Sequence, residues 1–180
     1  MSHSRRASRV KADSGGAPKG RGRSGPKHGF SLATPPRSYR TRGKRGPGGF
    51  WCACDDPPTW KREEAALKAL CRSDDDWRLL KSELRSLRER AANGDLFFGK
   101  DSEVYRSVTA DLVLELRFRQ RLQFPGGRRV VRLYFSEPAS IPSALVAAKI
   151  AGKPATGPGL ELQDEHMQDA QLRILKFLGL

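Results

Sequence analysis

The chain has 180 residues and a formal net charge of +14, which leaves room for one domain with a tail. No stretch approaches the roughly 18 apolar residues of a membrane span, and no apolar segment follows the N-terminal charges as in a secretory signal. We therefore expect a cytoplasmic protein without a membrane partner. Three cysteines do not make a disulfide framework, and Cys52-Ala-Cys54 lacks the usual spacer of a zinc knuckle, so we expect neither a metal nor another cofactor.

Residues 1–49 hold most of the net charge. They carry 13 Lys or Arg residues and one acidic residue, whereas residues 50–180 carry 21 basic and 19 acidic residues. The first segment also contains ten Gly, five Pro and very few large apolar residues. Because it cannot bury enough apolar surface to offset ordering entropy, we expect a disordered basic tail over 1–49 and a folded domain over 50–180.

The tail offers mobile cations that bind RNA or DNA weakly and with strong salt dependence. A solvated tail without a selected role is the alternative. The candidate RNA-binding residues of the tail are Arg37, Arg40, Arg42, Lys44 and Arg45.

Two amphipathic helices are predicted at the start of the folded part. Asp56-Pro57 is a helix start, and the helix should run to about Arg72. Ser73, followed by three aspartates, caps a second helix that should end at Asn93-Gly94. The short turn between them predicts a helical hairpin.

From about Leu112 the apolar spacing changes to two, which is typical of strands. In the first strand Leu112, Leu114, Leu116 and Phe118 point to one side, and Val113, Glu115, Arg117 and Arg119 point to the other. After a turn over 124–127, a second strand over 129–135 directs Arg132 and Tyr134 outward. A third strand is expected over roughly 144–151, and Asp164 can cap a final helix.

These elements predict an α+β fold: an N-terminal helical hairpin, a three- to four-stranded antiparallel sheet and a C-terminal helix. We expect the helices on one face of the sheet, so that the strands are half-buried, and a charged outer face on the other side.

The outer face of the sheet gathers the residues that can carry chemistry. Side chains two apart share a face, and neighbouring strands lie about 5 Å apart, so they can converge. The candidate catalytic residues are Glu115, Arg117, Arg132, Tyr134 and Lys149. The candidate RNA-binding residues of the domain are Arg119, Arg129 and Lys153.

Clustered cations beside a Tyr or Glu suit RNA cleavage without a metal. The 2′-hydroxyl attacks the adjacent phosphate, and fixed cations stabilise the negative charge of the transition state, while Glu or Tyr can assist proton transfer. The alternative is that alternating charges form only the solvated face of a strand. Tyr105 and His166 are expected to be surface or boundary residues outside the sheet.

The segments 111–117, 127–135 and 145–153 resemble the RelE/HigB-like superfamily of bacterial and phage toxins. Its members have two helices, a strand reading roughly L-x-E-L-R, a strand of the R-V-x-Y-F type, an apolar strand ending in lysines and often a C-terminal helix. The resemblance covers about residues 58–178. Glu115 and Arg117 match the E-L-R pair, Arg132 and Tyr134 match the second strand, and Lys149 and Lys153 match the terminal lysines. The family arginine usually stands three residues before the tyrosine, a place that Val131 occupies here, whereas Arg132 stands two residues before Tyr134. A strand shift by one residue turns a side chain to the other face, so Arg129 as the counterpart and a decayed site are the alternatives.

The resemblance implies an mRNA endonuclease, free or on the ribosome, that a cognate antitoxin with a helix-turn-helix domain holds inactive. The rival hypothesis is a non-catalytic nucleic-acid-binding protein of phage or mobile-element origin that works through its tail. A structural or interaction protein, with the Trp77–Leu87 stripe and the last helix at an interface, is a third hypothesis.

Overall fold

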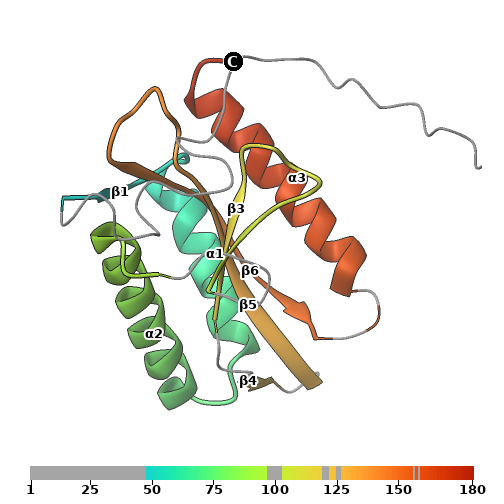
Figure 1. The fold of residues 1–180 in the computed structure, drawn as a ribbon. Coiled ribbons are helices and arrows are strands. Elements are labelled where there is room, and N and C mark those ends of the chain that lie inside the picture. The colour runs from blue at the N-terminus through green and yellow to red at the C-terminus, as the bar shows by residue number, and fades with distance from the viewer. Residues whose placement is uncertain (1–47, 97–102, 119–121, 125–126, 156, 158) are drawn as a thin grey trace, which may run out of the picture.

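Three helices enclose a twisted sheet in the computed structural model, which describes residues 48–96, 103–118, 122–124, 127–155, 157 and 159–180 (Figure 1). The expected combination of helices and sheet is confirmed. The tail residues 1–47 lie outside the described residues. In chain order the elements are β1 (Phe50–Ala53), α1 (Pro57–Leu70), α2 (Asp74–Asn93), β2 (Val104–Arg106), β3 (Leu114–Arg117), β4 (Leu122–Phe124), β5 (Gly127–Ser136), β6 (Ala144–Pro154) and α3 (Gly159–Phe177).

The predicted helical hairpin is confirmed, and its capping residues act as expected. The Asp56 carboxylate accepts a hydrogen bond from the Thr59 amide at the start of α1. The Ser73 hydroxyl accepts from the Asp76 amide at the start of α2, and Gly94 ends that helix in the left-handed region with a φ of 79°. These local interactions satisfy backbone groups that a helix end leaves without partners.

The sheet is larger than predicted, and it is mixed. Its main order is β1-β6-β5-β3-β2, and β4 also pairs with β5. β1 runs parallel to β6, and the other pairs are antiparallel. The prediction of a purely antiparallel sheet of three to four strands is therefore wrong. The short strands β1, β2 and β4 have three or four residues each, too few for an alternating pattern to stand out.

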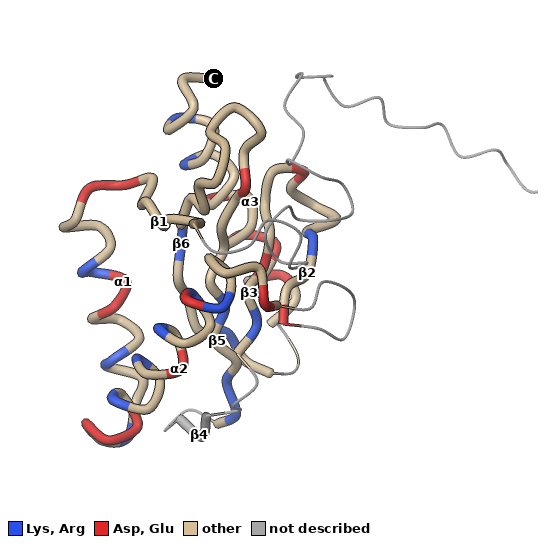
Figure 2. Tube along the Cα trace, turned by 60° about the vertical axis from the view of Figure 1, so that its left-hand side comes forward, with Lys and Arg blue, Asp and Glu red and all other residues tan. Residues whose placement is uncertain are grey.

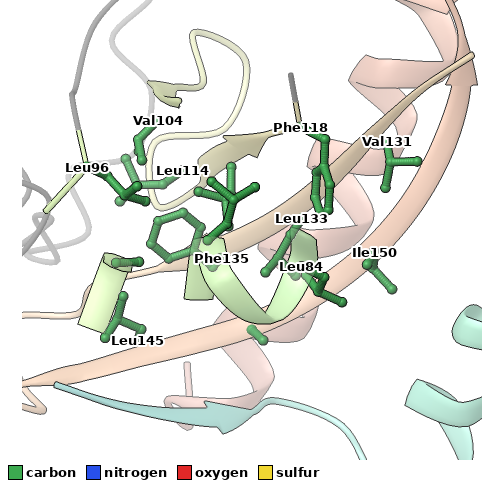
Figure 3. Packing of buried hydrophobic residues seen from close by; sticks show 14 of the residues in the cluster. Leu84, Leu96, Val104, Leu114, Phe118, Val131, Leu133, Phe135, Leu145 and Ile150 are labelled. Carbon is green, nitrogen blue, oxygen red and sulfur yellow. The ribbon is translucent and has the colours of Figure 1, made fainter. Parts of the chain in front are cut away.

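Both faces of the sheet carry a buried cluster, so the helices do not gather on one face as predicted. The face covered by α1 and α2, here called the hairpin face, holds alternate apolar residues of β3, β5 and β6. Figure 3 shows Leu133 beside Leu84 of α2, with Phe135 and Leu114 farther along the same cluster. The opposite face, here called the α3 face, packs Tyr134 and Ala148 against Met167, Ala170 and Ile174 of α3. In Figure 1, α3 lies on the other side of the sheet from α2.

Two element boundaries differ from the predictions in ways that affect the α3 face. β3 begins at Leu114, and Leu112 joins the cluster beneath α3 instead of the one beneath the hairpin. α3 begins at Gly159, five residues before the predicted cap at Asp164. The added turn carries Gln163 over the sheet. In the described part of the chain, no helix combines the length and the apolar character needed to cross a membrane.

Candidate functional site

A buried carboxylate, Glu115, stands at the centre of the α3 face. Leu114 and Leu116 enter the hairpin-face core, so the alternation of β3 directs Glu115 to the other side, where its side chain is fully buried. Glu115 Oε1 accepts hydrogen bonds from Arg117 Nε and from Arg132 Nε, each at 2.7 Å. Arg117 and Arg132 are partners in the β3–β5 register. Two guanidinium groups from neighbouring strands therefore share one carboxylate oxygen.

Helix α3 links a third cation to this centre. Gln163 Nε2 donates to Glu115 Oε2 at 2.6 Å, and Lys153 Nζ donates to Gln163 Oε1. Lys153 is 8% exposed, and burial followed by the positive charge of Arg132 lowers its pKa. Burial also lowers the pKa of Arg132, although Glu115 opposes the shift. Three cations around one carboxylate leave this centre with a local charge of about +2.

Two tyrosines flank the buried carboxylate. Tyr105 of β2 lies opposite Glu115 in the strand register, and the Arg117 guanidinium stands over its ring, 4.3 Å from the centroid. Tyr134 of β5 lies opposite Glu115 on the other side and is fully buried. Burial and the charge of Glu115 raise the pKa of Tyr134, so its hydroxyl stays protonated at neutral pH.

His166 of α3 stands next to Tyr134, with ring centroids 6.0 Å apart. Burial and the positive charge of Lys149 lower the pKa of His166 to about 4, so its imidazole is neutral at pH 7. Tyr134 Oη and His166 Nδ1 are both buried, and neither has a hydrogen-bond partner among the described residues. A donor and a potential proton acceptor thus lie close together under α3.

Of the residues predicted to form the site, Glu115, Arg117, Arg132 and Lys153 converge, and Tyr134 lies beside them. In Figure 2, blue segments that mark Lys and Arg lie on the neighbouring strands β3 and β5. Two of the other predicted cations, Lys149 and Arg129, lie away from Glu115. Arg119 and the tail residues Arg37, Arg40, Arg42, Lys44 and Arg45 lie outside the described residues.

Lys149 does not join this centre, although it lies opposite Tyr134 in the β5–β6 register. Its Nζ donates to Asp169 Oδ2 at 2.7 Å and stands 3.7 Å from Glu63 Oε1. Arg173 contacts the same two carboxylates. These ion pairs connect α1, β6 and α3, which suits a structural role.

Arg129 lies three residues before Arg132, so the alternation of β5 turns it to the opposite side. Its register partner is Pro154, and among the described residues its Nε has no hydrogen-bond partner, whereas Arg132 Nε donates to Glu115. Between the two possible counterparts of the family arginine, Arg132 is the one that lies beside Glu115.

The expectation of a solvated outer face is wrong. Glu115 and Tyr134 are fully buried because α3 packs over them, and the alternation of a strand does not reveal what covers its charged side. The expectation that Tyr105 lies outside the sheet is also wrong, since it belongs to β2. Gln163 precedes Asp164, the predicted start of the last helix, so no sequence pattern indicated a role for it.

In the described part of the chain, no group of three or more His, Cys, Asp or Glu side chains is arranged to hold a metal ion. Cys52, Cys54 and Cys71 are free thiols. Burial raises the pKa of Cys54 to about 12, so this thiol is a poor thiolate donor at neutral pH.

The chemistry that this arrangement supports is recognition of a single phosphodiester. The Arg117 and Arg132 side chains keep 26% and 13% of their surface exposed, and Arg132 Nη1 also donates to the Val131 carbonyl at 2.9 Å. The exposed parts of the two guanidinium groups can bind phosphate oxygens. Comparisons with protein-family models, with curated proteins and with solved structures find no match to this chain.

Proposed function

We propose that the protein is an mRNA endonuclease of the RelE/HigB-like kind, which cleaves RNA without a metal. The observation that carries the proposal is the convergence of Arg117, Arg132 and Lys153 around Glu115. The order of the elements supports it too, since two helices precede the strands that carry the E-L-R and R-x-Y residues, and a strand ending near Lys153 precedes a last helix. A cytoplasmic location and a cognate antitoxin with a helix-turn-helix domain, in a bacterium or phage, belong to the same proposal.

In this proposal Arg117 and Arg132 bind the scissile phosphate and stabilise the charge of its transition state. Glu115 is a positioning residue, because both of its oxygens are occupied by hydrogen bonds from the two arginines and Gln163. This assignment departs from a proton-transfer role for Glu115. A buried carboxylate that accepts three hydrogen bonds has little capacity left to take a proton from substrate.

Proton transfer then falls to the neighbouring groups. The 2′-oxygen attacks phosphorus, its proton passes to a base, the P–O5′ bond breaks, and the 5′-oxygen receives a proton. The products are a 2′,3′-cyclic phosphate and a 5′-hydroxyl. The neutral His166 imidazole suits the base, and the protonated Tyr134 hydroxyl suits the acid. Tyr134 is buried, so this step requires the first turns of α3 to shift.

A second candidate function is non-catalytic binding of nucleic acid through the basic segment 1–49. The full burial of Glu115 and Tyr134 favours it, because a covered site needs no substrate to explain its ion pairs. Under this alternative the cluster only stabilises the contact between α3 and the sheet.

Purified protein in an in vitro translation reaction tests the proposal. Wild-type protein should cut or stall a reporter mRNA, and Arg132→Gln should abolish the effect. Gln is chosen because a reversed charge would place two carboxylates together in a buried site. Arg78→Gln, in an exposed ion pair with Asp75, is the matched control. An mRNA left intact and fully translated by the wild type would rule out the enzyme.

A further inference from the structure

Two adjoining clefts lie on the hairpin side of the molecule, on the opposite face of the sheet from Glu115. One, of about 370 Å³, lies mainly along α2, and the other, of about 400 Å³, lies between β1 and the start of α1. Trp51, Glu64 and Arg88 line both, so the clefts form one continuous groove with a shared wall. The candidate endonuclease site uses none of these residues.

Arg88 is the unusual residue of this groove. Its guanidinium stands over the Trp51 ring, 5.1 Å from the centroid, and Trp51 Nε1 donates to the Arg88 carbonyl at 2.8 Å. Arg88 is half-buried, and this burial lowers its pKa, while the negative charge of Glu64 opposes the shift. Among the described residues, no carboxylate forms an ion pair with its guanidinium, and no side-chain hydrogen bond from it is found. A half-buried guanidinium that donates to no described side chain and is backed by an aromatic ring attracts a carboxylate.

Strand β1 forms the rim of the groove, and among the strands of the described residues it is the last one at this end of the sheet. The amides of Phe50 and Cys54 donate to Ser143 and Ala147, on the β6 side. In a parallel pair the backbone N–H and C=O groups of successive residues point alternately toward the partner strand and away from it. The groups of Phe50, Cys52 and Cys54 face β6, so those of Trp51 and Ala53 point away from it. Unpaired backbone groups on an edge strand can pair with an added strand.

We propose that this groove binds an extended segment of a partner protein, which pairs with the free edge of β1 and places an Asp or Glu side chain on Arg88. The backbone pairing contributes affinity, and the carboxylate fixes the position of the segment. The half-buried positive charge of Arg88, which forms no ion pair with a described carboxylate, favours an acidic side chain on the partner at this point of the groove.

The composition of the groove favours a peptide over RNA. Its lining includes three acidic residues beside four basic ones, so the field suits one carboxylate and disfavours a run of phosphates. The acidic residues are Asp55, Glu64 and Glu89, and the basic ones are Lys61, Lys81, Arg85 and Arg88. The edge of β1 also offers main-chain pairing that only another polypeptide can complete.

Selection of random linear peptides displayed on phage, with the full-length chain as bait, tests the proposal. We expect enriched peptides with an Asp or Glu at one recurring position among β-forming residues. The peptide should shift the NMR signals of the Trp51 indole and of the Trp51 and Ala53 amides. Arg88→Gln should weaken the selected peptide about tenfold or more, since a charge-assisted hydrogen bond is lost. Arg78→Gln, also on α2, should leave binding unchanged.

Two further measurements keep the outcome independent of whether Arg88→Gln folds. Replacing the recurring acid of the peptide by Gln or Asn should weaken binding to the wild-type chain by a similar factor. Ala53→Pro, which removes an outward amide, should weaken binding while Arg88 remains. Three results would overturn the proposal. The selected peptides could lack a recurring acidic residue, they could bind Arg88→Gln as tightly as the wild type, or they could shift only NMR signals of the α3 face. Single-stranded RNA that shifts the Trp51 signals more than the peptides do would also overturn it. None of these outcomes depends on RNA cleavage.

Discussion

Glu115 is a buried charge whose cost is offset by its partners. A buried carboxylate loses its hydration, and it is tolerated here because two guanidinium groups and an amide donate to it. Removal of the carboxylate also leaves Arg132, whose side chain is only 13% exposed, without its counter-charge. The cluster therefore affects stability whatever its role in catalysis.

Glu115→Gln should lower the free energy of unfolding by about 3 kcal/mol, as expected when one partner of a buried ion pair is removed. Urea denaturation measures the change. Asp75→Asn removes an exposed partner of Arg78 and should leave the urea midpoint unchanged. A stability equal to that of the wild type would mean that the Glu115 network is open to water.

His166 predicts a pH dependence of stability. The unfolded chain takes up a proton near the ordinary pKa of 6.5, whereas burial and Lys149 keep the folded imidazole neutral down to about pH 4. The unfolded state therefore binds more protons between these values, so stability is fully present above pH 6.5 and falls as pH decreases toward 4. Because water reaches this half-buried ring, the loss should be on the order of 1–2 kcal/mol.

The difference between wild type and His166→Asn in urea unfolding at several pH values isolates this contribution, since Asp169 and the other carboxylates titrate in both. The wild-type curve should be steeper between pH 6.5 and 4. Parallel curves would show that His166 is solvated in the folded protein.

At the scale of elements, α3 holds the site together, and its first residue controls how closely it approaches β6. Gly159 packs against the carbonyl of Pro154, and a Cβ there would overlap that backbone oxygen. The contact sets the start of α3, whose next turn carries Gln163 to Glu115. A glycine is required at this position because a Cβ would meet a backbone oxygen of β6, and backbone atoms cannot move aside as the end of a flexible side chain can.

Gly159→Ala should push the start of α3 away, lower the free energy of unfolding by about 1–3 kcal/mol and separate Gln163 from Glu115. Gly152→Ala is the matched control, because its added Cβ would meet only the methyl ends of Leu70 and Leu67, at 3.2 and 3.4 Å. Thermal unfolding and the Gln163 side-chain NMR signals report both effects. Equal behaviour of the two variants would contradict the close approach.

The elements that the sequence predicts well are those with local signals. Asp56 and Ser73 cap their helices, and the alternation around Glu115 correctly separates Leu114 and Leu116 from the charged side. Alternation cannot tell which layer covers a face, so the burial of Glu115 and Tyr134 beneath α3 was not predictable. The separation of Lys149 from the site depends on Asp169 and Glu63, which reach it only in the folded chain.

At the scale of the whole molecule, charge is divided between two parts. Residues 1–49 carry 13 basic residues, whereas the remainder is nearly neutral. The proposed catalytic centre belongs to the nearly neutral part, while diffuse attraction to nucleic acid belongs to the basic segment. Binding and cleavage should therefore respond differently to truncation.

Deletion of residues 1–47 removes all 13 of these cations and leaves β1 in place. We expect weaker RNA binding with a markedly smaller salt dependence, because fewer counterions are released. The cleavage rate at saturating RNA should be largely retained. Filter binding at several salt concentrations and single-turnover cleavage separate the two quantities, and circular dichroism checks folding. Loss of both together would contradict the assignment of cleavage to the nearly neutral part, whereas a full-length chain that binds RNA through the basic segment but never cleaves it would support the non-catalytic alternative.

The most direct test of the central claim is single-turnover cleavage of a purified single-stranded RNA with analysis of the product ends. We predict 2′,3′-cyclic phosphate and 5′-hydroxyl ends with wild-type protein, also in the presence of a chelator. Arg117→Gln and Arg132→Gln should each reduce the rate at least tenfold, as expected for the loss of a donor to the transition state, whereas Arg78→Gln should not. Cleavage that persists unchanged in both arginine variants, or that yields 5′-phosphate ends, would contradict the assignment of the cations around Glu115 as the catalytic centre.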